Sequence, residues 1–338
     1  MPAQLPFEIV EHIVEYLDVE DVRSIARVCS AFRLPAQLRL FKTIRIISNG
    51  SITYPKSYES ILSSLHLLQC SSQLILSFSS SMQQTSIHSL CSHLPTMYRL
   101  RNIEISLPPN DYSRVLSVLE SLGSEREIAL RLGCFMAPDL LISDNPLPVY
   151  SLHLYVGAST HQLATRLVQK CSQSLRKLSL FLEDKTTPLL PFLPHLCEVS
   201  LQSRLHNLDN DWDLMPWYPF LYQHPAITRI SLDPMFTSAG QPPTNLLPNI
   251  QSLEAHPAII ERLIPGRPVE CITASYPDRT TGRFSDDILL RPLQQSIVSV
   301  TTLAIKTYTY FSDNVLINII QTLPKLRNFS FDWYCDGV

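Results

Sequence analysis

Residues 1–46 decide how the N-terminal part of this chain folds, and they read MPAQLPFEIVEHIVEYLDVEDVRSIARVCSAFRLPAQLRLFKTIRI. Pro6 suits the first turn of a helix, and Glu8 favours the positive end of the helix dipole. Apolar residues then recur at steps of three and four, at Ile9, Val10, Ile13, Val14 and Leu17. This spacing predicts one amphipathic helix with an apolar stripe.

A second helix is predicted to begin after Asp18, which stands where an N-cap belongs. Its apolar stripe consists of Val22, Ile25, Ala26, Cys29 and Phe32. Pro35 opens a shorter third segment, after which residues 43–46 alternate as a strand does. Because a unit of roughly 40 residues rarely closes a core of its own, these stripes predict a partner.

The order of residues in this stretch resembles the F-box, the adaptor-binding motif of ubiquitin-ligase subunits. The resemblance rests on Leu5-Pro6, Glu8-Ile9, Ile13, Leu17, Asp21, Val28-Cys29, Phe32 and Leu40-Phe41, in that order. Residues 33–46 resemble in particular the F-box proteins of filamentous and mushroom-forming fungi. An ordinary N-terminal helical hairpin, packed on whatever follows it, is the alternative interpretation.

The resemblance implies that these helices dock on a Skp-type adaptor and, through it, on a cullin-RING ligase. It implies adaptor contact at the matching positions, which are Leu5, Pro6, Ile9, Ile13, Leu17, Val28, Cys29 and Phe32. The chain would then be the substrate-recognition subunit of a Skp/cullin/F-box ubiquitin ligase, with a protein target that the sequence does not name. The alternatives are a repeat-based interaction scaffold without a ligase role and an enzyme of an unfamiliar type.

The composition indicates a folded chain that depends on other proteins. Hydrophobic residues make up 45% of the 338 residues, whereas charged residues make up only 17%, against about 25% in an average domain. A net charge of −3 with no basic run gives no footprint for nucleic acid or for an anionic membrane. No stretch approaches the length of a membrane span, and no signal peptide is recognisable.

Residue spacing argues against catalysis, a cofactor or a metal. The eight glycines are too far apart for a phosphate-binding loop, and the eight cysteines include no CxxC pair. His88, Cys91 and His93 do not share one helix face, and residues 209–213 lack the Gly and Glu of a calcium loop. Cysteines on apolar faces fit free thiols in a reducing compartment, which predicts the cytoplasm or the nucleus.

Beyond residue 46, one apolar pattern returns with steps between copies of 19 to 31 residues. Its copies are Leu100-Ile103-Ile105, Val149-Leu152-Leu154, Leu175-Leu178-Leu180, Leu196-Val199-Leu201, Ile227-Ile230-Leu232, Ile250-Leu253-Ala255, Val269-Ile272-Ala274, Val300-Leu303-Ile305 and Leu326-Phe329-Phe331. Weaker copies are Phe41-Ile44-Ile46, Leu74-Leu76-Phe78 and Ile128-Leu130-Leu132. The last two apolar residues of each copy alternate like a strand, and capped helical patterns lie between copies.

This alternation predicts an α/β fold in which residues 1–46 form a helical domain and residues 47–338 form an array of strands and outer helices. The array resembles a degenerate leucine-rich repeat, although the polar residue that normally follows each copy is missing. We therefore expect an irregular α/β solenoid with a parallel sheet. A doubly wound α/β domain is the alternative.

Two surfaces are predicted to contact a target. The first is the row between the last two apolar residues of each copy, at Glu104, His153, Ser179, Ser200, Ser231, Glu254, Thr273 and Ser330. The second is an aromatic insertion at residues 206–223, from which Trp212, Trp217 and Tyr218 are candidate contacts. The alternative for the insertion is an aromatic helix that covers the sheet, which is the more common use of such residues.

Overall fold

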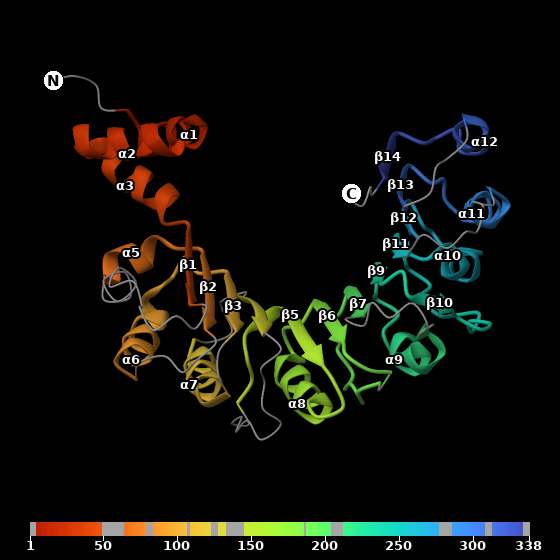
Figure 1. Ribbon diagram of the computed structural model, residues 1–338, viewed down its shortest axis with the longest axis horizontal. Helices are drawn as coiled ribbons and strands as arrows, with labels where there is room; N and C mark the ends of the chain where they lie inside the picture. Colours follow the sequence, from red (N-terminus) through yellow and green to blue (C-terminus); the bar gives the residue numbers. More distant parts are fainter. Residues whose placement is uncertain are drawn as a thin grey trace. The chain divides into compact units, whose positions relative to one another are not determined.

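A computed structural model of the chain shows three N-terminal helices followed by alternating strands and helices (Figure 1). The structure describes residues 5–48, 64–78, 84–106, 109–122, 128–132, 145–185, 187–203, 212–276, 286–307 and 313–333. The chain forms two compact units, Met1–Tyr150 and Ser151–Val338. The boundary expected at residue 46 lies inside the first unit and stays a prediction.

The N-terminal helices pack around a small core of their own, contrary to the expectation that so short a unit would not close one. They are α1 (Phe7–Tyr16), α2 (Val19–Val28) and α3 (Ser30–Leu40). Val14, Val22 and Ala36 are buried at the centre, and Leu17, Ala26, Phe32 and Leu40 pack around them. The predicted N-cap is confirmed, since the Asp18 carboxylate accepts a hydrogen bond from the Asp21 amide at 2.8 Å. The Arg39 guanidinium donates to the Val14 carbonyl and so ties α3 to α1.

The break between the second and third helices differs from the sequence-based expectation. Cys29 is extended, with φ −130° and ψ 125°, and therefore ends α2. Phe32 lies on α3, and Pro35 lies inside that helix instead of opening it. The apolar spacing continued across Cys29 because both helices turn apolar residues toward one core, and spacing alone does not report a change of backbone direction.

The first unit continues as a parallel sheet covered by helices. Its strands are β1 (Thr43–Ser48), β2 (Gln73–Phe78), β3 (Asn102–Ser106) and β4 (Ile128–Leu132). Its helices are α5 (Leu65–Cys70), α6 (Gln84–His93), η1 (Leu94–Thr96) and α7 (Pro109–Glu120). Figure 1 shows α5, α6 and α7 on one side of these strands. Ile44, Leu74, Ile103 and Leu130 pair in register along one row.

The second unit repeats the same plan of parallel strands covered by helices. Its paired strands are β5 (Val149–Val156), β6 (Lys177–Leu182), β7 (Glu198–Ser203), β9 (Arg229–Leu232), β11 (Ser252–Ala255), β12 (Cys271–Ser275), β13 (Thr302–Thr307) and β14 (Asn328–Trp333). Its helices are α8 (His161–Cys171), η2 (Met215–Trp217), α9 (Tyr218–Gln223), α10 (Pro257–Leu263), α11 (Asp286–Leu293) and α12 (Asp313–Thr322). A short parallel pair, β8 (Trp212–Asp213) and β10 (Phe236–Ser238), stands apart from this sheet.

The strand register of the second unit confirms the repeat pattern. Leu178 pairs with Val199, and Val199 pairs with Ile230, as the repeat pattern requires of neighbouring parallel strands. The row continues through Leu253, Ile272, Leu303 and Phe329. The repeats are irregular as expected, because residues 187–197 connect β6 to β7 without a helix. The α/β fold with a leucine-rich-repeat-like parallel sheet is therefore confirmed.

A buried cation holds one loop of the second unit in place. The Arg267 guanidinium donates to the carbonyls of Leu246 at 2.7 Å, Leu263 at 2.8 Å, Pro265 at 3.1 Å and Pro243 at 3.5 Å. Burial lowers its pKa, and the nearby Tyr218 opposes that shift. Arg267 therefore joins the loop before β11, through Leu246 and Pro243, to the C-terminal end of α10, through Leu263. The dipole of α10 also favours a cation at that end.

We expect Arg267→Met to lower the free energy of unfolding of the second unit by about 2–4 kcal/mol, because it leaves several buried carbonyls without a donor. All three tryptophans lie beyond residue 150, so tryptophan fluorescence during urea unfolding reports this unit. Arg229→Met, at an exposed position of β9, is the matched control and should change stability by less than about 0.5 kcal/mol. Equal losses in the two variants would contradict the role given to Arg267.

Candidate functional site

Helix α1 carries apolar residues on two faces. Val10 and Val14 are buried on the inner face, and Val14 packs with Val22 of α2 and Ala36 of α3. Ile9 and Ile13 remain 48% and 37% exposed, and Tyr16 is 80% exposed. Residues four and three positions apart lie on one side of a helix, so Ile9, Ile13 and Tyr16 form a single outward stripe.

The structure divides the residues predicted to contact an adaptor into two groups. Leu5, Pro6, Ile9 and Ile13 are exposed. Leu17 and Phe32 instead pack on the internal core of the three helices, and Cys29 is half-buried where α2 meets α3. The side chain of Val28 lies outside the described residues. Adaptor contact through any of these residues stays a prediction.

Sequence reasoning missed several exposed apolar residues of the same helices. They are Phe7, Tyr16, Val19 and Leu34. The three-residue step from Ile13 could have found Tyr16, whereas Phe7, Val19 and Leu34 follow no stripe that the sequence shows. Exposed apolar residues gathered among polar ones are typical of protein interaction sites, and α1 also exposes Glu8, His12 and Glu15.

The decisive comparison concerns this same segment. The F-box-like family model matches residues 2–46. Residues 2–46 are an F-box-like domain. The F-box-like domain thus contains α1, α2, α3 and the start of β1, and the sequence-based prediction of an F-box is confirmed. The assignment to fungal F-box proteins stays a prediction.

Comparisons of the whole chain identify no relative beyond the match of the F-box-like domain that informs on function. No curated protein matches the chain. Among solved structures, the crystal structure of the Rad7 and Elc1 complex in yeast is similar, with 14% sequence identity and a TM-score of 0.40. The match covers 91% of this chain and 87% of that chain. Similarity this distant says nothing about function.

The strands present a polar row on the face opposite the helices. In the second unit, the predicted row pairs in register from His153 through Ser179, Ser200, Ser231, Glu254 and Thr273 to Ala304 and Ser330. In the first unit, Glu104 pairs in register with Arg131, whose guanidinium lies 3.9 Å from its carboxylate. Most of these side chains are small, so the row would allow a partner backbone to approach closely.

Charged and aromatic side chains border this row in the second unit. Lys306 reaches the Glu254 carboxylate at 2.6 Å, and Ser231 donates to the same carboxylate at 2.9 Å. The Tyr155 and Phe181 rings stack with centroids 4.8 Å apart. The face therefore combines hydrogen-bonding groups, a cross-strand ion pair and a half-buried aromatic pair.

The prediction that the aromatic insertion contacts a target is wrong for its three named residues. Trp212, Trp217 and Tyr218 are only 3%, 2% and 8% exposed. Trp212 packs near Phe236 with ring centroids 5.6 Å apart, and the Tyr218 hydroxyl donates to the Ala239 carbonyl. Large aromatic rings bury about 150–250 Å² each, and here that area fills the core of the second unit, as the alternative interpretation held. Residues 206–211 lie outside the described residues.

Neither a cluster of metal-ligating residues nor a membrane-spanning helix occurs in the described part of the chain. Within it, no group of three or more His, Cys, Asp or Glu side chains could hold a metal ion. His88, Cys91 and His93 lie on α6. No helix in the described part has the length and apolar character needed to cross a membrane.

His224, at the end of the aromatic segment, is a buried and fully bonded histidine. Its Nε2 accepts a hydrogen bond from the Leu193 amide at 2.8 Å, and its Nδ1 donates to the Phe220 carbonyl at 2.6 Å. Burial lowers the pKa of His224, and the bond to Phe220 partly opposes that shift. The neutral ring therefore joins α9 to the helix-free segment before β7.

We expect His224 to make the second unit less stable in acid. Its pKa is lower in the folded chain than the unfolded value of about 6.5, so its contribution is complete above that pH and is lost as the pH falls through the folded pKa. Within that window, the free energy of unfolding should fall by about 1.4 kcal/mol per pH unit from this group.

Urea unfolding followed by tryptophan fluorescence at several pH values measures this dependence. His224→Gln keeps one donor and one acceptor without titrating, so it should remove this part of the acid dependence. His195→Gln, at an exposed position before β7, should retain it. An unchanged acid dependence in His224→Gln would contradict the assignment.

Proposed function

We propose that the chain is a substrate-recognition subunit of a Skp/cullin/F-box ubiquitin ligase. The observation that carries the proposal is the F-box-like domain at residues 2–46, together with the apolar stripe that α1 leaves exposed. F-box proteins are substrate receptors in ubiquitin ligases, so this domain supports a receptor role. The Skp-type adaptor, the cullin-RING ligase and the protein target are parts of the proposal.

The proposed mechanism is proximity without chemistry by this chain. The F-box-like domain binds the adaptor, and the repeat sheets hold a target within reach of a ubiquitin-carrying enzyme supplied by other subunits. Tethering of this kind raises the effective concentration of a target lysine at the enzyme and lowers the entropic cost of the encounter. No catalytic residue and no cofactor is assigned to the chain.

The proposed adaptor contact and target contact use different surfaces of the chain. We assign adaptor contact to the exposed residues Leu5, Pro6, Ile9, Ile13 and Tyr16, because burying exposed apolar area is the main driving force for association. We assign target contact to the polar row of the second sheet, between the stacked Tyr155 and Phe181 and the Glu254–Lys306 pair. The six described cysteines are free thiols, so we place this assembly in the cytoplasm or the nucleus.

Replacing Ile9 and Ile13 together by Ala tests the adaptor surface. We expect adaptor affinity to fall by at least about 2 kcal/mol, or roughly 30-fold, because interface anchors in desolvated pockets cost that much when truncated. Melting of the chain should change little, since both side chains are exposed in the chain alone. Titration calorimetry with purified adaptor, beside a melting curve, measures the two effects.

A matched control for this test comes from the second unit. Ile317 and Ile320 lie on α12 and are 50% and 68% exposed, so replacing both by Ala removes the same chemistry elsewhere. Adaptor affinity should be unchanged in that control. If the Ile9 and Ile13 variant also binds normally, or if the chain does not bind the adaptor at all, the scaffold without a ligase role becomes the better description.

Replacing Ser179 and Ser200 together by Arg tests the target surface. These serines are adjacent in the row, so two long cations there should exclude a partner that approaches the strands. Proteins captured with the tagged chain, identified by mass spectrometry, should include a subset that this variant loses while it retains the adaptor. Gln162→Arg with Gln169→Arg, at exposed positions of α8, is the control. Identical captured sets would show that the row is not the target surface.

A further inference from the structure

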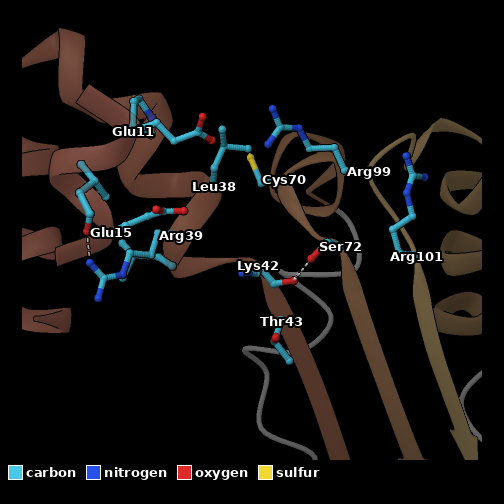
Figure 2. A pocket seen from close by; sticks show the side chains of 13 residues that line it. Glu11, Glu15, Leu38, Arg39, Lys42, Thr43, Cys70, Ser72, Arg99 and Arg101 are labelled. Carbon is cyan, nitrogen blue, oxygen red and sulfur yellow. Dashed lines mark hydrogen bonds between the residues drawn. The ribbon is translucent and has the colours of Figure 1, made fainter. Parts of the chain in front are cut away.

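The first unit contains an open hollow of about 760 Å³ between the F-box-like helices and the beginning of its sheet (Figure 2). One wall comes from α1 and α3 and includes Glu11, Glu15 and Leu38. The other wall comes from the turns that lead into β1, β2 and β3 and includes Lys42, Arg99 and Arg101. The volume lies within the range of about 300–1,000 Å³ that small-molecule sites occupy.

The parallel sheet places the basic residues on one wall of the hollow. The Ser72 amide donates to the Lys42 carbonyl at 3.0 Å, and the Arg101 amide donates to the Ser72 carbonyl at 2.8 Å. Lys42, Ser72 and Arg101 are therefore consecutive rungs at the amino ends of three neighbouring strands. Arg99 stands two residues earlier on the turn into β3. No acidic residue lines this wall of the hollow.

The cations of this wall have few partners of their own. Among the described residues, neither the Lys42 ammonium nor the Arg99 guanidinium forms an ion pair or a hydrogen bond. Within the described part of the chain, Arg101 makes two long hydrogen bonds, at 3.3 Å, to the carbonyls of Tyr98 and Leu100 in its own turn. These positive charges on one wall would attract a bound anion.

The helical wall of the hollow carries negative charge, from Glu11 and Glu15, whereas the opposite wall is positive. Figure 2 shows Glu11 and Arg99 extending toward the hollow from opposite sides. The other cation of this region, Arg39, is engaged by the Val14 carbonyl. An anion would therefore be attracted to the sheet wall by three cations and repelled by Glu11 and Glu15 across the hollow. This asymmetry gives opposite expectations for variants of the two walls.

We propose that this hollow binds a small polyanion of phosphate-ester or polycarboxylate chemistry, held by Lys42, Arg99 and Arg101. Guanidinium groups present forked donors that match the oxygens of both phosphate and carboxylate, and a lysine adds a point charge. Bound there, the ligand joins the start of the sheet to the F-box-like helices and stabilises the first unit by mass action. The site does not depend on the proposed ligase function.

Titration calorimetry of the full chain with pyrophosphate and with citrate tests the proposal, at an ionic strength matched with potassium chloride. We expect saturable binding of at least one of the two probes. Arg99→Gln should weaken it about tenfold or more, because a charged hydrogen-bond donor is lost. Glu11→Gln should strengthen it about two- to fivefold, because a repelling charge is removed across a partly exposed gap. Arg114→Gln, at an exposed position of α7 outside the hollow, should leave it unchanged.

The two probes identify the source of the anion. Binding of pyrophosphate alone points to a phosphate ester, and binding of citrate points to a polycarboxylate. Failure of both probes to bind overturns the proposal, as does equal weakening in Arg99→Gln and Arg114→Gln. If Arg99→Gln does not fold, the Glu11→Gln variant decides: tighter binding supports the site, and unchanged or weaker binding overturns it.

Discussion

The structure depends on one constraint, which is that each strand of a parallel sheet must present the same kind of residue at the same rung as its neighbours. A slip of one residue would turn the apolar set of a strand to the wrong face. Leu178, Val199 and Ile230 show the constraint satisfied, since they pair directly and are buried beneath the outer helices. No single repeat could bury these residues alone, so stability is shared between neighbours.

The apolar row becomes exposed at the last strand of the sheet, β14. Leu303 on β13 is fully buried, whereas Phe329 beside it on β14 is 41% exposed. Phe331, two residues on, is 36% exposed, although its neighbour Ile305 is fully buried. In the part of the chain that the structure describes, β14 has a paired strand on one side only. The apolar row therefore becomes exposed at β14, whereas Ile44 and Ile46 on the other edge strand, β1, stay buried.

Features that depend on the local spacing of apolar residues could be predicted from the sequence. Changes in backbone direction, and the burial of a side chain by residues distant in sequence, could not. The register of the repeats could be predicted because the three apolar positions of each copy fix both the strand and its inward face. The end of α2 at Cys29 could not be predicted, because the apolar spacing runs through that break unchanged. The burial of Trp212 and Trp217 was missed because large aromatics suit a core and an interface equally well, and only their neighbours decide between the two. Of the predicted adaptor residues, Ile13 and Leu17 illustrate the same difficulty: four residues apart on one stripe, one is exposed and the other packs on the core.

The in-register pairing of parallel strands also explains how a chain with few charges acquires chemically distinct surfaces. Because equivalent positions of successive repeats become neighbours, a residue type that recurs at one position becomes a row in space. Ser179, Ser200 and Ser231 become a small polar row on the open face of the second sheet. Lys42 and Arg101, about two repeats apart in sequence, stand at matching positions just before β1 and β3, with Ser72 between them just before β2. A single substitution in such a row therefore acts on its neighbours as well.

Charge or size added at one repeat changes the electrostatic potential or the space at the adjacent repeats. Substitutions within one row should therefore have non-additive effects, whereas substitutions in separate rows should act independently.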